Sequence, residues 1–233
     1  MHQIDIPDHI RARIVRLRGR AHIFERIDPA RTAHVVVDLQ NGFMAEGAPV
    51  EVPTAREIVP NVNAISAALR QAGGTNVFLR YTCDTAEKQS WSARYSEYLS
   101  AERSATHQKT FSRGAEPWQL WPLLDVQPND LIVDKTRFSA FVPGTCALHD
   151  MLAARGIDTL IVTGTLTNVC CESTTRDAMQ RNYRVIFVAD GNAALTDAEH
   201  NASLCNIATL FADVMTTAEV LAVLASSKLR GAA

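Results

Sequence analysis

Residues 158–178 read DTLIVTGTLTNVCCESTTRDA, and this stretch decides the fold. The β-branched apolar run at 158–164 predicts a buried strand, and the pattern over 169–182 predicts a helix. Gly164 marks the turn between them, and the pair Thr167 and Asn168 is suited to capping the helix. A buried strand that leads through a short turn into a helix is typical of a parallel sheet.

The same alternation of strands and helices continues on both sides of this unit. Short apolar runs predict strands at 33–38, 75–80, 130–134, 158–164, 183–190 and 212–217. Helical periodicity fills most of the gaps, at 57–72, 145–155, 169–182, 197–210 and 218–226. We therefore expect an α/β fold with a doubly wound, mostly parallel, six-stranded sheet in a Rossmann-like three-layer arrangement, with helices on both faces.

Two regions depart from this alternation. Residues 1–30 carry many arginines among scattered apolar positions, so we expect an Arg-rich N-terminal extension before one domain at 31–233. A helix in the extension is expected to lie on the domain or on a neighbouring subunit. Residues 81–124 hold Trp91, Trp118 and Trp121 among mixed polar residues, and an insertion of this kind often covers a pocket.

Composition and charge exclude several classes of function. The 23 Lys and Arg residues nearly balance the 25 Asp and Glu residues, so no global field favours nucleic acid or an anionic membrane. The five cysteines follow no CxxC spacing, which argues against a structural zinc site. No signal-like segment and no apolar run near membrane-spanning length is visible, so we expect a cytoplasmic protein whose thiols stay free.

Polar side chains close three of the predicted strands. Asp38 ends VVVD, Lys135 follows LIVD, and Cys170 begins the helix after LIVTG. Because ligands of open parallel sheets bind beyond the carboxyl ends of the strands, we expect these three residues to meet at one edge. Each has a plainer alternative: a turn residue for Asp38, a solvated lysine for Lys135, and a packing residue for Cys170.

The three side chains have complementary chemistry. A thiol at a helix N-terminus is expected to have a lowered pKa, which makes Cys170 a candidate nucleophile. None of the seven histidines is well placed as its base. A desolvated Asp38 carboxylate can accept the thiol proton, and a Lys135 ammonium stabilises both anions. Cys171 lies about 100° further round the helix, so we expect it to serve in packing.

The motifs VVVDLQNGF, DKTRFSAF and VTGTLTNVCCESTTRDA together resemble those of the isochorismatase-like cysteine hydrolases, over residues 31 to 225. The resemblance implies a catalytic triad of Asp38, Lys135 and Cys170. It also implies a cis peptide bond between Thr165 and Leu166, and an oxyanion hole formed by the Leu166 and Cys170 N–H groups. The implied reaction is attack of the thiolate on an amide or ureido carbonyl, followed by hydrolysis of a thioester.

Details of the motifs narrow the expected activity. The metal-binding histidines of nicotinamidases have no counterpart in MAEGAPVEVPT, so we expect no bound metal and no other cofactor. SRGAEPWQLWPLL and DKTRFSAF resemble the branch that contains N-carbamoylsarcosine amidases and ureidoacrylate amidohydrolases, so the expected reaction is cleavage of a small amide, carbamoyl or ureido compound. The alternatives are a vinyl-ether hydrolase of the isochorismatase type and an inactive scaffold. The resemblance also implies a homo-oligomer, a dimer or tetramer. We expect the arginine-rich extension to be one of its subunit contacts.

Four of the five residues expected to line the substrate pocket come from the same motifs, and Tyr81 follows the strand predicted at 75–80. The aromatic side chains would form its walls, and Arg137 would pair with a substrate carboxylate. Ordinary packing is the alternative role for each of these residues, which are Asn41, Phe43, Tyr81, Arg137 and Phe138.

Overall fold

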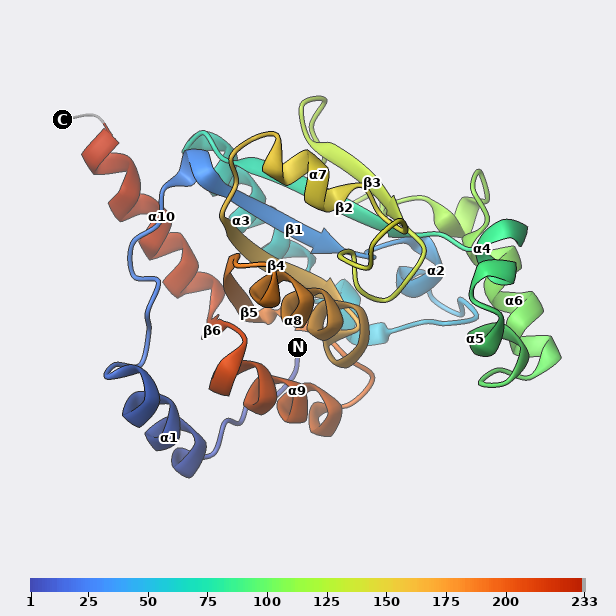
Figure 1. The fold of residues 1–233 in the computed structure, drawn as a ribbon, viewed down its shortest axis with the longest axis horizontal. Coiled ribbons are helices and arrows are strands. Elements are labelled where there is room, and N and C mark those ends of the chain that lie inside the picture. Colours follow the sequence, from blue (N-terminus) through green and yellow to red (C-terminus); the bar gives the residue numbers. More distant parts are fainter. Residues whose placement is uncertain (232–233) are drawn as a thin grey trace.

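Six parallel strands form the centre of the molecule, in the order β3-β2-β1-β4-β5-β6 (Figure 1). The structure is a computed structural model that describes residues 1–231. The predicted strands are all present and the sheet is parallel throughout, so the expected fold class is confirmed. The strands are β1 (Thr32–Val37), β2 (Thr75–Tyr81), β3 (Leu131–Lys135), β4 (Thr159–Thr165), β5 (Arg184–Ala193) and β6 (Asp213–Met215).

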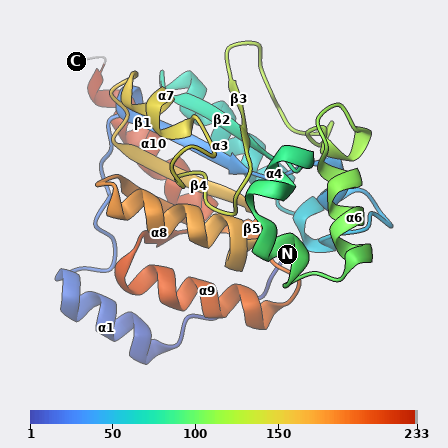
Figure 2. The ribbon, with the colours of Figure 1, turned by 45° about the vertical axis from the view of Figure 1, so that its right-hand side comes forward.

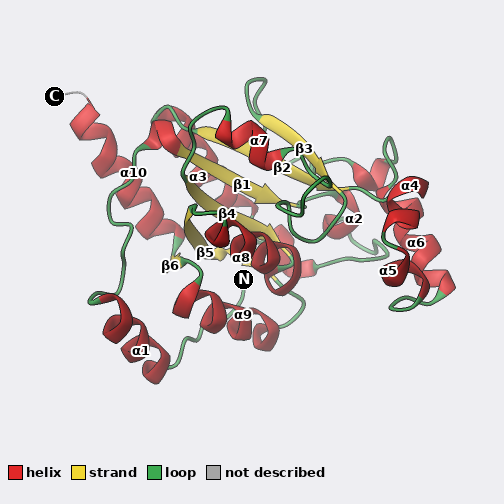
Figure 3. Ribbon diagram, viewed as in Figure 1, coloured by secondary structure: helices red, strands yellow, loops and turns green. Residues whose placement is uncertain are grey.

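Helices cover both faces of the sheet (Figure 3). One apolar core joins the sheet to α7, α8 and α9, and another joins the opposite face to α3 and α10. The longer helices are α1 (Asp8–Arg18), α3 (Val59–Gln71), α6 (Ala101–Phe111), α8 (Glu172–Gln180), α9 (Asp197–Leu210) and α10 (Thr217–Gly231). The short helices and turns are η1 (Pro29–Arg31), α2 (Asn41–Met44), η2 (Pro53–Arg56), α4 (Thr85–Ser90), α5 (Ser92–Ser96), η3 (Glu116–Trp118), α7 (Leu148–Ala153) and η4 (Thr167–Cys171).

The strand order reverses between β1 and β4, which lie side by side at the centre of the sheet. Every residue of both strands is buried, as expected for β-branched runs covered on two faces. Gly164 lies near the end of β4 with a φ of 125°, and a Cβ atom there would lie 2.1 Å from the Val37 carbonyl oxygen. Only glycine at this position therefore lets the ends of β1 and β4 lie this close together.

The N-terminal segment packs on its own chain. Helix α1 lies along the outside of α9 (Figures 1 and 2), and Ile6 and Ile14 are buried. Arg18 donates to the Ala208 and Ala212 carbonyl oxygens, and Arg13 donates to Thr209. These arginines thus make contacts within the chain, and a role for the extension between subunits stays a prediction.

The insertion at 81–124 forms helices α4, α5 and α6, which we call the cap helices. They lie beyond the carboxyl ends of the central strands (Figure 1), where the predicted site is located. None of the helices in the described part of the chain is long and apolar enough to span a bilayer.

Candidate active site

Asp38, Lys135 and Cys170 meet at the carboxyl ends of β1, β3 and β4. Asp38 follows β1, Lys135 is the last residue of β3, and Cys170 lies in the turn η4 after β4. The Lys135 Nζ atom lies 2.7 Å from the Asp38 Oδ2 atom, and both side chains are completely buried. The Cys170 thiol lies close enough to both groups for their charges to shift its pKa. The folded sheet therefore brings together three side chains that are far apart along the chain.

The backbone aims the carboxylate of Asp38 into the site. Asp38 has a φ of 54°, a left-handed conformation that few residues other than glycine adopt, so the chain turns sharply where β1 ends. Gln40 fixes the chain after this turn, because its amide donates to the Tyr81 and Trp118 carbonyl oxygens and accepts from the Tyr81 N–H. The Asp38 carboxylate is paired with the Lys135 ammonium, and among the described residues its oxygens have no hydrogen-bond partner.

Burial dominates the electrostatics of the three groups. It raises the pKa of Asp38, although the Lys135 ammonium opposes this shift. Burial also favours a neutral lysine, but the attraction of Asp38 and Cys170 outweighs it and raises the pKa of Lys135. Burial raises the pKa of Cys170 despite the neighbouring ammonium, so the expected lowering was wrong. The resting cysteine is a thiol beside a carboxylate that can take its proton.

The segment 166–171, which we call the cysteine turn, is not the regular helix start that the sequence predicted. It is a π-helical turn in which the Cys171 N–H donates to the Leu166 carbonyl oxygen over 3.1 Å, and α8 begins only at Glu172. Thr167 and Asn168 make no capping hydrogen bond, so that expectation was also wrong. The Thr167 hydroxyl instead pairs with His200.

The backbone of the cysteine turn carries the groups expected for an oxyanion hole. The peptide bond between Thr165 and Leu166 is cis, at the position that the resemblance implied. No acceptor for the Leu166 N–H is found among the residues that the structure describes. Cys170 retains 5% exposure, whereas Cys171 is completely buried in the core between α8 and the sheet.

A pocket of about 410 Å³ opens beside the cysteine turn. Leu166 and Val169 of the cysteine turn line it, and so does Phe138. Among the described residues that line it, Arg94 alone is charged, and its guanidinium lies 5.3 Å above the Phe138 ring. The remaining lining residues also come from the insertion and are Trp91, Ala93 and Tyr98. The sequence predicted that this insertion covers a pocket, but Trp91 is the one residue among these four that the sequence analysis singled out.

The other predicted substrate-binding residues do not line this pocket. Phe43 stacks on Phe111 in the core, and the Tyr81 hydroxyl bonds to that of Tyr95, so both have packing roles in this structure. Asn41 donates to the Glu116 carboxylate and carbonyl oxygens.

Arg137 lines a neighbouring hollow of about 480 Å³. Its guanidinium donates to the Thr136 and Ser90 carbonyl oxygens, over 2.9 and 3.0 Å. Because main-chain oxygens already hold this guanidinium, Arg94 is better placed than Arg137 to meet a substrate carboxylate.

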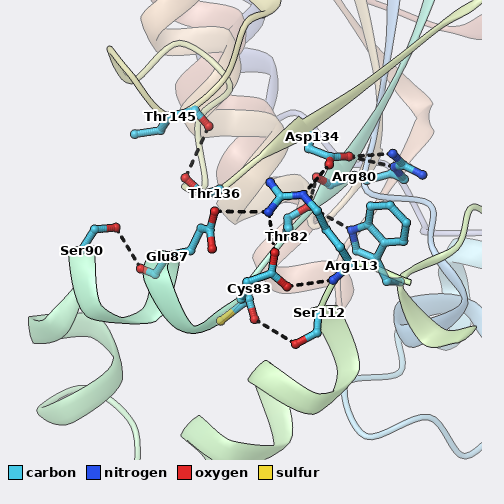
Figure 4. A network of polar contacts seen from close by, with 12 residues as sticks. Arg80, Thr82, Cys83, Glu87, Ser90, Ser112, Arg113, Asp134, Thr136 and Thr145 are labelled. Carbon is cyan, nitrogen blue, oxygen red and sulfur yellow. Dashed lines mark hydrogen bonds and ion pairs between the residues drawn. The ribbon is translucent and has the colours of Figure 1, made fainter. Parts of the chain in front are cut away.

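A polar network fixes the cap helices to the sheet (Figure 4). Arg113, just after α6, forms ion pairs with Asp84 and Glu87 at the start of the cap and with Asp134 in β3. Arg80 in β2 pairs with the same Asp134 over 2.9 Å. Asp134 directly precedes Lys135 in β3. The network therefore connects the cap helices to the strand that carries Lys135.

Histidines and acidic residues do not gather into a metal site here. Among the described residues, no group of three or more His, Cys, Asp or Glu side chains is arranged to hold a metal ion. His34 is buried in β1 between Ser66 and Thr163, and burial lowers its pKa to about 3. That the enzyme works without metal stays a prediction.

Comparisons with known proteins agree with this geometry. The isochorismatase domain family matches residues 32–219. The chain belongs to the isochorismatase family. A ureidoacrylate amidohydrolase RutB from Pseudomonas savastanoi pv. phaseolicola (strain 1448A / Race 6) is 32% identical over 221 residues, which cover 89% of this chain and 88% of the relative. The resemblance seen in the motifs is thereby confirmed.

Solved structures of this family share the fold. A cysteine hydrolase from Pseudomonas syringae pv. phaseolicola 1448A matches with a TM-score of 0.76 and 32% identity, over 89% of this chain and 98% of its own. N-carbamoylsarcosine amidase from Thermoplasma acidophilum matches with a TM-score of 0.63 and 25% identity, over 80% of this chain and 96% of its own. The chain is thus an isochorismatase-like hydrolase whose relatives include amidohydrolases.

Proposed function

We propose that this hydrolase is a metal-independent cysteine amidohydrolase that cleaves the C–N bond of a small amide, carbamoyl or ureido compound. The observation that carries the proposal is the buried Asp38–Lys135 ion pair close to Cys170, at the point where the strand order reverses. An enzyme of this kind needs a nucleophile, a base and a fixed positive charge, and these side chains supply all three. The names of its relatives support the C–N bond as the target.

The proposed reaction begins with the thiol. As the Cys170 sulfur forms a bond to the substrate carbonyl carbon, its proton passes to the Asp38 carboxylate. The N–H groups of Leu166 and Cys170 stabilise the oxyanion that develops. The C–N bond then breaks, and Asp38 gives its proton to the leaving nitrogen, which departs as ammonia or an amine.

Hydrolysis of the thioester completes the cycle. Asp38 takes a proton from water as the water oxygen attacks the thioester carbonyl carbon. The C–S bond breaks, and the proton returns from Asp38 to the sulfur. Throughout, the Lys135 ammonium stabilises whichever neighbour carries the negative charge, because burial would otherwise disfavour both anions.

The pocket suggests the shape and charge of the substrate. Its aromatic walls, Trp91 and Phe138, suit a flat molecule, and Arg94 suits a carboxylate held away from the scissile bond. Ureido and carbamoyl acids combine a planar group with such a carboxylate, so we propose them as the preferred class.

The test is release of ammonia from a panel of small amides, N-carbamoyl amino acids and ureido acids. We expect turnover by the wild type and by a Cys205→Ser control, because that thiol lies on α9 away from the pocket. The Cys170→Ser variant should be inactive, since a hydroxyl is a poor nucleophile beside a carboxylate base. Turnover at the wild-type rate in Cys170→Ser would disprove the proposal.

A further inference from the structure

A histidine on α9, which the proposed mechanism does not use, contacts the cysteine turn. His200 lies on α9, is completely buried, and its Nδ1 atom lies 2.9 Å from the Thr167 hydroxyl. Thr167 is itself completely buried and is the first residue of η4. Its contact with His200 joins the turn that carries Cys170 to a helix on the outer layer.

The N-terminal segment in turn holds His200. The imidazole of His2 stacks on that of His200, with ring centroids 4.3 Å apart and an interplanar angle of 15°. The side chain of His2 is only 3% exposed. Its Nε2 atom accepts a hydrogen bond of 2.9 Å from the Ala194 N–H, so the proton of the neutral ring is on Nδ1, which lies 2.7 Å from an Asp197 carboxylate oxygen. Both ring nitrogens of His2 are therefore engaged, and the ring is fixed in place.

Main-chain hydrogen bonds keep the segment against α9. The Asp5 N–H donates to the Asn201 side-chain oxygen over 2.8 Å, and the Asn201 amide donates to the Gln3 carbonyl oxygen over 2.9 Å. Burial lowers the pKa of His200 to about 4, so its contact with Thr167 joins uncharged groups at neutral pH.

We propose that the N-terminal segment positions the cysteine turn through the chain His2, His200 and Thr167, and that His2 and His200 are positioning residues for the reaction. His2 lies outside the residues 32–219 that match the family. The proposal rests on Cys170 being the nucleophile. A displacement of the reacting atoms by about 1 Å can cost on the order of a hundredfold in rate, so loosening one support of the turn should be visible in kcat.

The experiment compares His2→Ala with His9→Ala in the full-length chain. His9 is exposed on α1, so its variant controls for loss of a histidine from the same segment. We expect His2→Ala to lower kcat about tenfold with little change in KM, and to slow alkylation of Cys170 by iodoacetamide by a similar factor. His9→Ala should match the wild type. Both rates are measured well below the unfolding midpoint of each variant.

Milder variants separate positioning from folding. Asp197→Asn removes the charged partner of His2 at an exposed position, and we expect a smaller loss of kcat in the same direction. His200→Asn keeps a polar atom near the Nδ1 position and should retain more activity than His200→Leu. Cys170→Ser, assayed in parallel, reports separately on the nucleophile. Lower thermal stability of His2→Ala with unchanged kcat and unchanged Cys170 alkylation would show that the segment only stabilises the fold and would overturn the proposal.

Discussion

Replacement of Lys135 by methionine tests the electrostatic design of the site. Asp38 and Lys135 are both completely buried, and their charged atoms lie 2.7 Å apart. Without the ammonium, the attraction that opposes the burial of Asp38 is lost, so the pKa of Asp38 should rise further. A carboxyl group that is neutral when folded and ionised when unfolded destabilises the fold increasingly as pH rises above its unfolded pKa.

The size of this effect follows from linkage. With an unfolded pKa of about 3.9, keeping Asp38 protonated costs about 1.4 kcal/mol for each pH unit above that value. Relative to a variant in which this side chain does not titrate, such as Asp38→Asn/Lys135→Met, the free energy of unfolding of Lys135→Met should therefore be lower by about 4 kcal/mol at pH 7 but only by about 1.5 kcal/mol at pH 5. Removing one partner of a buried pair typically costs about 3 to 5 kcal/mol, which agrees with the figure at neutral pH.

Urea unfolding at these two pH values provides the assay, with the double variant Asp38→Asn/Lys135→Met as the reference. The double variant buries no charge at this place, so the extra dependence on pH should vanish and much of the stability should return. Lys135→Met, Asp38→Asn and the double variant should all lack most turnover, since each lacks the base or its stabilising charge. The same stability difference between Lys135→Met and the double variant at both pH values would refute this account of the ion pair.

Three further predictions concern the pocket, the second thiol and metal. Arg94→Met should raise KM for N-carbamoyl-β-alanine about tenfold, because a charge-assisted hydrogen bond to the substrate carboxylate is lost, but it should leave hydrolysis of the corresponding carboxamide unchanged. Arg103→Met is the control, and equal effects of Arg94→Met on both compounds would contradict the role of Arg94. Cys171→Ala should lower the free energy of unfolding by about 1 kcal/mol and keep turnover, as checked by denaturation and ammonia release. Dialysis against EDTA should leave the rate unchanged, and a loss restored by a divalent metal would contradict the proposed chemistry.

The strands and the residues at their ends were predictable because the rules behind them are local. Asp38 and Lys135 close β-branched runs, Cys170 follows another, and parallel strands bring their carboxyl ends to one edge. The conformation of the cysteine turn and the pKa of Cys170 were not predictable in this way. A helix N-terminus alone suggests a lowered pKa, but the depth of burial, which decides the direction, depends on the whole surrounding structure.

The pocket and the support of the cysteine turn depend on contacts between distant segments. Arg94 lines the pocket from the irregular insertion, which Arg113 ties to Asp134 in β3, and no periodic pattern encodes such ion pairs. The contact between His200 and Thr167 joins elements from different layers. In the sequence, His200 is only a histidine in a helical pattern, so its position was visible only in the folded chain.

The most direct test of the central claim is to identify the residue that reacts. The enzyme is quenched in acid during turnover of an N-carbamoyl substrate, or alkylated with iodoacetamide at neutral pH, and the modified peptide is sequenced by mass spectrometry. We predict that the acyl or carbamidomethyl group is on Cys170 and that substrate protects Cys170 from alkylation. Modification of Cys171 with Cys170 untouched, or alkylation of Cys170 that leaves full activity, would contradict the account.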